Sequence, residues 1–297
     1  MGNIRFGKHM GTQESHIREL LVWIEDNLTN PLSLDIVSAK SGYTKWYLQR
    51  MFKKQTGLSL ASYIRARRLY IAAFALRFTQ KSILDISVEY QFDNQQTFSR
   101  CFKKHFAESP SVYRHARKQD FSNLVRSLAA SQPGDIQVER VSIARGQYAF
   151  HGKQYAYHLD IEKLDKSHLP QRSALRAQFY TLLGERPAQI YSFTQLVPDG
   201  ERVRVDYTLG VTADYPLREG VALEPLPEIH GEFCRFRYSG KPVALNDHII
   251  QIYTQVLPEM GLARGDGPDM TVFSYSLSGK EELHLELQHL VPVVPLH

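Results

Sequence analysis

Residues 44–54 read TKWYLQRMFKK, and residues 94–104 read NQQTFSRCFKK. Aligned at this offset of 50, the chain matches itself without a gap, and eight of the identities fall in three segments. Three lie in Leu34–Ile36, four in Arg50–Lys54 and one at Tyr63, each matched fifty residues later. A gapless repeat of this kind indicates a duplicated structural unit.

Each copy reads as a short helix, a turn and a second helix. Ser33 is a candidate N-cap for the first short helix, and Gly42 is a candidate stop. Thr44 and Asn94 occupy the same position before the two second helices, where their side chains can accept hydrogen bonds from free backbone amides. A longer helix is predicted at 60–78, and residues 14–117 show no strand-like alternation. The N-terminal part is therefore predicted to be all-α.

The second helix of each copy has two different faces. Leu48 and Phe52, like Phe98 and Phe102, lie four residues apart and form an inward face. The other face is a polar stripe at positions i, i+3, i+4 and i+7, made of Trp46, Gln49, Arg50 and Lys53 in one copy and Gln96, Ser99, Arg100 and Lys103 in the other. Arginine can grip guanine, glutamine can pair with adenine, and lysine neutralises phosphate. One such helix could simply expose a solvated polar face, and Trp46 could cap a core. The repeated stripe favours DNA.

Charge and composition agree with a soluble DNA-binding chain. Residues 1–118 hold 19 lysines and arginines against nine acidic residues, whereas residues 119–297 hold 17 against 22. The N-terminal part therefore attracts polyanions and the rest does not. No apolar run reaches the length of a membrane span, and the N-terminus has no secretory segment. Two distant cysteines suit a reducing compartment, so we expect a cytoplasmic protein with no membrane partner.

The pattern changes after a polar stretch that closes with Pro133-Gly134. Short runs rich in Val, Tyr, Phe and Thr follow, several of them alternating apolar with polar residues, which predicts antiparallel strands. Segments 172–183 and 244–257 read as helices. We therefore predict a multi-domain chain with an all-α domain at 12–118, a linker at 119–135 and an α+β antiparallel-sheet domain at 136–297.

The segments AKSGYTKWYLQRMFKKQTG (39–57) and FDNQQTFSRCFKKHFAESPSVYR (92–114) resemble the AraC/XylS family of transcription regulators. The resemblance is to the subgroup that contains MarA, SoxS and Rob, and it extends over residues 14–117. It implies two helix-turn-helix units joined by the long central helix, reading successive major-groove segments of promoter DNA as a monomer. It also implies transcription activation through RNA polymerase.

Carried over residue by residue, the resemblance gives a DNA-binding set. The base-reading positions are Trp46, Gln49, Arg50, Gln95, Gln96, Ser99 and Arg100, accompanied by Lys45, Lys53, Lys54, Lys103 and Lys104. Tyr47 stands where MarA-like proteins usually have histidine, and Ser99 where threonine is common. These two departures could alter the preference among related promoter sites without altering the mode of binding.

The C-terminal part resembles the GyrI/SbmC family, which proteins similar to Rob also carry. The resemblance rests on GEFCRFRYSG (231–240), on LHLELQHLVPV (283–293) and on two strand–helix–strand–strand halves. It implies an aromatic-lined site for small amphipathic effectors between the halves. The family's glutamate, four residues before a proline, is Gln288 here, which leaves neutral ligands open; Glu286 is a candidate substitute. The candidate aromatics, which could equally be core residues, are Tyr191, Phe193, Tyr207 and Tyr275.

The sequence shows little sign of catalytic or metal-binding sites. No nucleophile elbow, P-loop or dinucleotide fingerprint occurs, so we predict no enzyme and no cofactor. His284 and Glu286 could share a metal, but no third ligand is evident, and Cys234 reads as a small buried hydrophobe. Two other roles stay open for the C-terminal part, a partner-binding module on a constitutive regulator and a small-molecule hydrolase.

Overall fold

The computed structural model describes residues 12–116, 136–163, 168–274 and 285–296. These residues form two compact units, described separately below. The helical unit holds described residues 12–76 and 81–114, and the sheet unit holds those from 136 onward. Within the described residues, no helix is long and apolar enough to cross a membrane. The predicted linker at 119–135 falls entirely outside these residues, so the predicted domain limits stay a prediction.

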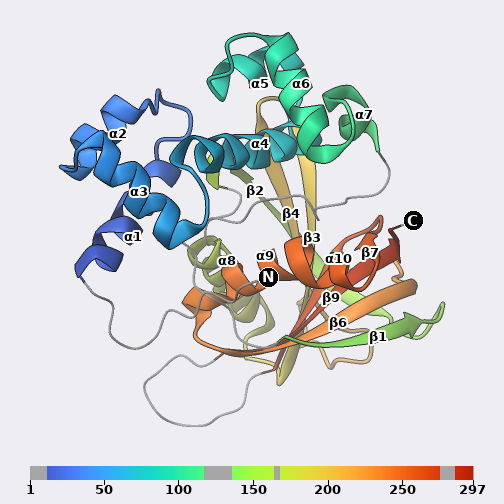
Figure 1. Ribbon diagram of the computed structural model, residues 1–297. Coiled ribbons are helices and arrows are strands. Elements are labelled where there is room, and N and C mark those ends of the chain that lie inside the picture. Colours follow the sequence, from blue (N-terminus) through green and yellow to red (C-terminus); the bar gives the residue numbers. More distant parts are fainter. Residues whose placement is uncertain (1–11, 117–135, 164–167, 275–284, 297) are drawn as a thin grey trace. The chain divides into compact units, whose positions relative to one another are not determined.

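The helical unit is built on one long helix that joins two helix-turn-helix pairs (Figure 1). The long helix is α4, and its observed limits are those expected from the sequence. The helices of this part of the chain are α1 (Thr12–Glu25), α2 (Leu34–Ser41), α3 (Lys45–Thr56), α4 (Leu60–Phe78), α5 (Ile83–Glu89), α6 (Gln95–Phe106) and α7 (Pro110–His115). The all-α prediction for this half is therefore confirmed.

The predicted helix caps are present. The Ser33 side chain accepts from the amide of Ile36, and α2 ends at Gly42 in the left-handed conformation. Thr44 caps α3 and Asn94 caps α6, each accepting an amide hydrogen three residues on. These short-range bonds satisfy amides that helix geometry leaves unpaired, which is why they could be predicted locally.

The two copies differ where the second helix ends. α3 ends at Gly57, with φ of 76°, whereas α6 ends at Ala107, with φ of 63°. A left-handed conformation suits glycine and strains an alanine, because the β-carbon approaches the backbone. The second copy therefore carries a local strain that the first avoids.

A buried ion pair fixes α1 to α4. Both carboxylate oxygens of Glu25 accept from the Nε of Arg67, at 3.0 and 2.9 Å, and the Tyr63 hydroxyl donates to the same carboxylate. The side chains of Arg67 and Glu25 are 1% and 13% exposed, and the guanidinium also lies 4.1 Å from the ring of Tyr70. This network sets the position of α1 on the helical unit.

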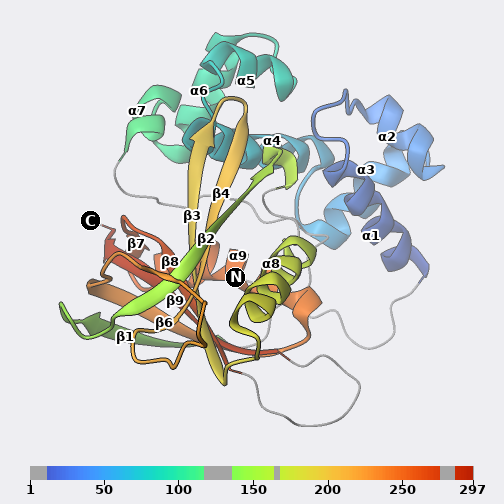
Figure 2. The same cartoon turned by 180° about the vertical axis from the view of Figure 1, so that it is seen from behind.

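The sheet unit is antiparallel throughout its described strands, as predicted (Figure 2). Its strand order is β1-β6-β9-β8-β3-β4-β2-β5, and β7 pairs with β9 off this path. The strands are β1 (Gln137–Ile143), β2 (Phe150–Leu159), β3 (Gln189–Asp199), β4 (Arg202–Thr212), β5 (Glu224–Pro225), β6 (Gly231–Gly240), β7 (Leu262–Arg264), β8 (Asp269–Ser274) and β9 (Leu285–Pro295). Two halves, β2-helix-β3-β4 and β6-helix-β8-β9, meet where β3 pairs with β8.

Both halves place their helix on the same face of the sheet. α8 (Leu169–Leu183) packs Phe179 and Leu183 against strand residues of both halves. The second helical segment contains α9 (Leu245–Gln251), a π-helical turn (Ile252–Val256) and α10 (Leu257–Glu259). Short 3-10 turns occur at Ile161–Lys163 and Pro242–Ala244. α8 begins three residues earlier than predicted, and the π turn was not predicted.

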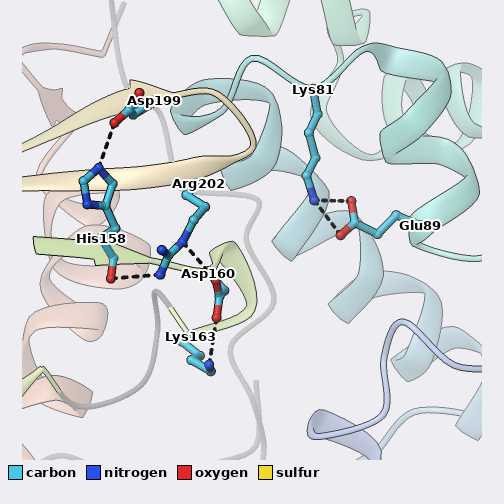
Figure 3. Close-up of polar contacts among 7 residues, drawn as sticks. All are labelled: Lys81, Glu89, His158, Asp160, Lys163, Asp199 and Arg202. Atoms are coloured by element: carbon cyan, nitrogen blue, oxygen red, sulfur yellow. Dashed lines mark hydrogen bonds and ion pairs between the residues drawn. The ribbon is translucent and has the colours of Figure 1, made fainter.

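Exposed ion pairs lie at the ends of β2, β3 and β4. His158 Nε2 lies 2.7 Å from Asp199, and Asp160 lies 2.7 Å from Lys163 and 3.2 Å from Arg202 (Figure 3). In the helical unit, Figure 3 shows Lys81 paired with Glu89 at 2.7 Å. The exposed pairs at the ends of β2, β3 and β4 contribute about 0–1 kcal/mol each, whereas the side chains of Lys81 and Glu89 are only 13% and 25% exposed. The exposed pairs therefore add little to the stability of the sheet unit.

Candidate nucleic-acid interface

The first candidate helix, α3, is held from beneath by apolar side chains. Leu48 and Phe52 are fully buried, and the Phe52 ring lies 5.7 Å from the ring of Tyr63 on α4. These are the inward residues that the sequence predicts. Because they anchor one side of α3, the opposite side is held toward solvent in a fixed orientation.

The outer side of α3 presents the predicted stripe. Gln49, Arg50, Lys53 and Lys54 are all exposed, and Trp46 is 66% exposed. Trp46 therefore does not cap a core. The Arg50 guanidinium lies 5.3 Å from the Trp46 ring centroid, a cation–π arrangement that limits the orientations of the arginine.

The second candidate helix, α6, is backed by a continuous aromatic cluster. Phe98 lies 5.5 Å from Phe102, which lies 4.4 Å from Phe106 and 5.3 Å from Tyr113 on α7. Outside this support, Gln95, Gln96, Arg100, Lys103 and Lys104 are exposed and Ser99 is half-buried. The predicted stripe is thus present here also, and Gln96 takes the position that Trp46 has in the first copy.

Few carboxylates of the same chain offset the positive charges of the two stripes. Lys45 forms an ion pair with Asp35 of α2, and both side chains are more than half exposed. Among the described residues, no carboxylate forms an ion pair with the other six candidate cations, which are Arg50, Lys53, Lys54, Arg100, Lys103 and Lys104. Their charges are therefore available to a polyanion.

A helix-turn-helix domain model matches residues 37–116 of the chain. The transcriptional regulator Rob of Salmonella typhimurium is 34% identical over 292 residues, which is 95% of this chain and 99% of Rob. The right origin-binding protein of Escherichia coli is 33% identical over 95% of this chain and 99% of its own length. The chain belongs to the AraC/XylS family.

Within this family, the chain falls in the MarA/SoxS/Rob subgroup. The regulatory protein SoxS of Escherichia coli is 50% identical over 99 residues, covering 33% of this chain and 92% of SoxS. The AraC-type regulator described here is therefore a DNA-binding transcription regulator whose helix-turn-helix region matches SoxS and whose full length matches Rob. The resemblance expected from the sequence is confirmed.

Two contacts beside α3 were not predicted. Asp35 positions Lys45 from the preceding helix, and Tyr43 connects α1 to α3. The Tyr43 hydroxyl lies 2.9 Å from Nδ1 of His16, and its ring lies 5.0 Å from that of Tyr47. Of these contacts, only the Lys45–Asp35 pair could have been predicted from the sequence, because its opposite charges lie on either side of the turn. Tyr47, one departure from the MarA-like pattern, thus has a structural partner.

In the sheet unit, four of the candidate ligand residues share one sheet face. Paired residues in antiparallel strands project to the same face, and alternate residues along a strand do likewise. Tyr191 pairs with Val272, which pairs with Gln288 on β9, and Phe193 and Glu286 follow two residues along their strands. Tyr191 and Gln288, two strand spacings apart, are thus about 10 Å from each other. We call this side, opposite α8, the open face.

Aromatic residues gather on the open face around Tyr191. The Phe150 ring lies 4.6 Å from Tyr191 and 5.3 Å from Phe193. Burial and the neighbouring Tyr148 raise the pKa of Tyr191, so its phenol stays protonated. Phe193 is 7% exposed and belongs to an apolar cluster, whereas Tyr191 is only partly buried. Of this pair, Tyr191 is the more accessible to a ligand.

Two other candidates do not join this group. Tyr207 pairs with Thr194, the residue next to Phe193, so its side chain lies on the helix-covered face. It is fully buried among Phe179, Leu209 and Phe273. The expectation that Tyr207 shares one site with Tyr191 and Phe193 is therefore wrong. Tyr275 lies outside the described residues, as does His284 of the metal pair considered above.

Other chemical groups in the sheet unit are buried or dispersed. Cys234 is fully buried, and burial raises the pKa of its thiol, so it packs as the small hydrophobe that the sequence suggests. Among the described residues, no three His, Cys, Asp or Glu side chains are grouped to hold a metal ion.

Proposed function

We propose that this regulator is an activator that binds promoter DNA as a monomer, inserting α3 and α6 into successive segments of the major groove. The observation that carries the proposal is the repeated stripe, exposed on two capped helices whose other sides are anchored by buried aromatic and aliphatic residues. Rigid support of this kind places side chains at fixed positions relative to base edges. Transcription activation would follow from contact with RNA polymerase.

The two helices differ in how freely their arginines move. Trp46 restrains Arg50, whereas no corresponding aromatic contact restrains Arg100 among the described residues. Because restraint before binding reduces the entropy lost on binding, α3 would discriminate bases more sharply than α6. The first half of the DNA site would therefore tolerate fewer substitutions than the second.

Fluorescence anisotropy with a selected promoter site and single-base variants tests the DNA assignment. Arg50→Ala should weaken specific binding by about 1–3 kcal/mol and relax the choice at one or two base pairs. Lys53→Ala should weaken all DNA nearly equally and reduce the slope of log K against log salt by about one. Arg237→Ala, which removes an equal charge from the sheet unit, is the control.

If Arg50→Ala discriminates between bases as well as wild type does, α3 is not the helix that reads the bases. A binding stoichiometry of two chains per site would contradict the monomer. Addition of purified RNA polymerase to the same complex, with transcript formation as the readout, tests activation separately.

For the sheet unit we propose that it resembles GyrI-like domains and senses small amphipathic molecules. Its open face offers a partly buried phenol, a neighbouring aromatic pair and the Gln288 amide in one continuous row. Gln288→Ala should weaken an effector bound there, and the same change should leave DNA affinity unaltered without effector. A unit that binds no small molecule would instead favour a role as a partner-binding module.

A further inference from the structure

Three side chains connect α1 to the first turn of α3. The hydroxyl of Tyr43, in the turn before α3, is hydrogen-bonded to Nδ1 of His16 on α1 at 2.9 Å. The Tyr43 ring in turn lies 5.0 Å from the ring of Tyr47 on α3, at an angle of 51°. α1 and α3 are neighbours in the helical unit (Figure 1). We call His16, Tyr43 and Tyr47 the α1 brace.

The α1 brace is itself fixed to the helical unit. On α1, Ile17 next to His16 is 3% exposed, and the helix is tied to α4 by its buried ion pair. In the turn, the Tyr43 amide donates to the Ser41 hydroxyl at 3.3 Å, and the Tyr43 carbonyl accepts from the Ser38 hydroxyl at 2.5 Å. Tyr43 is therefore held in place through both its backbone and its side chain.

The α1 brace meets α3 on a different side from the residues that anchor this helix. Leu48 and Phe52 hold α3 from beneath, and Tyr47 directly precedes Leu48, which places it about 100° around the helix axis. Contacts on two sides resist rolling of a helix about its axis better than contacts on one side. Groups at the surface of a helix lie about 5–6 Å from the axis, so a roll of about 10° moves them by about 1 Å. A recognition site tolerates about 0.5 Å, so a roll of this size is enough to disturb base reading.

The sequence of the second copy does not repeat the α1 brace. At the offset of 50, the three positions are occupied by Ala66, Asp93 and Thr97. None of these side chains carries a ring, so the same chain of contacts cannot form beside α6. The α1 brace therefore belongs to the copy that also pairs Trp46 with Arg50. This difference favours a role in the reading function of α3 over a general requirement of the fold.

We propose that His16 is a positioning residue for DNA recognition. Through the α1 brace it fixes the rotation of α3 about its axis, and thereby the direction in which Trp46, Gln49 and Arg50 meet base edges. The inference rests on the proposed reading role of α3, and it adds a residue that lies outside both helix-turn-helix pairs. Because base contacts specify and phosphate contacts position, loss of the brace should reduce discrimination between bases more than affinity for DNA in general.

Fluorescence anisotropy on the full chain, with the selected promoter site and its single-base variants, tests the proposal. The base pairs read by α3 are those at which Arg50→Ala relaxes discrimination. His16→Ala should lower discrimination at these base pairs by about threefold to tenfold, the range expected for the loss of one neutral hydrogen bond. Discrimination at the other base pairs and affinity for unrelated DNA should change by less than about twofold.

Variants assign the effect to the hydrogen bond. Tyr43→Phe keeps the ring and removes the hydroxyl, so its loss should equal that of His16→Ala, and the double variant should lose no more than either one. His16→Asn should stay within about twofold of wild type, because its amide oxygen can accept from the Tyr43 hydroxyl. Val22→Ala, a change of an exposed residue on the same helix, is the control and should match wild type.

Urea unfolding, read by tryptophan emission, checks that the fold is kept. His16 is exposed, so His16→Ala and Val22→Ala should have similar midpoints. A variant with an unchanged midpoint and reduced discrimination has lost the setting of α3 and kept its fold.

The outcomes distinguish this inference from the proposed function. If Arg50→Ala relaxes base choice and His16→Ala does not, the positioning role is overturned and α3 remains the reading helix. An equal loss of affinity for all DNA in His16→Ala, or additive losses in the double variant, also overturns the positioning role. If Arg50→Ala relaxes no base choice, the reading role of α3 fails and the positioning role fails with it.

Discussion

Removal of the Glu25 carboxylate should destabilise the helical unit more than any surface charge change. In Glu25→Ala, Arg67 and Tyr63 both lose the carboxylate that holds α1 on α4. The Arg67 side chain is 1% exposed, so water cannot readily replace the lost partner. Breaking one side of a buried pair typically costs about 3–5 kcal/mol, which is a large part of the stability of a domain this size.

Tryptophan fluorescence gives a selective assay. The two tryptophans of the chain, Trp23 and Trp46, both lie in the helical unit, so their emission follows that unit during urea unfolding. With a urea m-value of about 2 kcal/mol/M, the midpoint should fall by roughly 2 M. Asp35→Ala, which breaks the exposed pair with Lys45, should cost less than about 1 kcal/mol.

A double replacement tests the physical reason rather than the position. Because desolvation offsets much of the attraction between buried charges, Glu25→Leu with Arg67→Met should be much less destabilising than Glu25→Ala alone. If Glu25→Ala shifts the midpoint no more than Asp35→Ala does, the pair is not a structural tie and the reasoning is refuted. The same follows if the double variant loses as much stability as the sum of the single changes.

Three further outcomes are expected. Ala107→Gly should stabilise the helical unit by about 0.5–1 kcal/mol, because glycine relieves the left-handed strain that Gly57 avoids in the first copy; urea unfolding read by tryptophan emission measures this. Trp46→Ala combined with Arg50→Ala should show a coupling of about 0.5–1 kcal/mol in DNA binding, and additive losses would exclude a restraining role for the ring. The pKa of His289 is lowered from 6.5 to about 4, so the unfolded state takes up its proton first and stability should fall as the pH drops from 6.5 towards 4, by at most about 3 kcal/mol. His289→Gln should flatten this decline in tyrosine near-UV circular dichroism of the sheet unit, and an unchanged pH profile would exclude His289 as its source.

The features of the helical unit that could be predicted are those that depend on residues three or four positions apart in the sequence. Thr44 and Asn94 cap helices through bonds to amides three residues away, and the buried faces of α3 and α6 follow from four-residue spacing. The Glu25–Arg67 pair could not be predicted in this way, because its members lie 42 residues apart and meet only after α1 has packed on α4. The left-handed Ala107 was missed because alanine gives no local signal for that conformation.

In the sheet unit, strand type was predictable and strand register was not. Alternation of apolar and polar residues shows that a segment is a half-buried strand, but the face of each side chain depends on the pairing. Tyr207 was therefore assigned to the wrong group, although its pairing with Thr194 shows that it lies on the helix-covered face. The π turn that carries Tyr253 to Asp269 is likewise invisible to a 3.6-residue pattern.

The same register bears on the charge of any effector. On the open face, Gln288 stands between Val272 and Arg237, so a neutral amide occupies the position where the GyrI-like resemblance implies a carboxylate. On the other face, Arg172 donates to Tyr157 and Arg176 to Tyr207, and Asp269 forms an ion pair with Arg264. Carboxylates lie close to both sets of arginines, since Glu139 is 4.0 Å from Arg237 and, against the effect of burial, Asp269 raises the pKa of Arg172. If the sheet unit binds an effector as proposed, the neutral amide of Gln288 favours a neutral molecule over a cation.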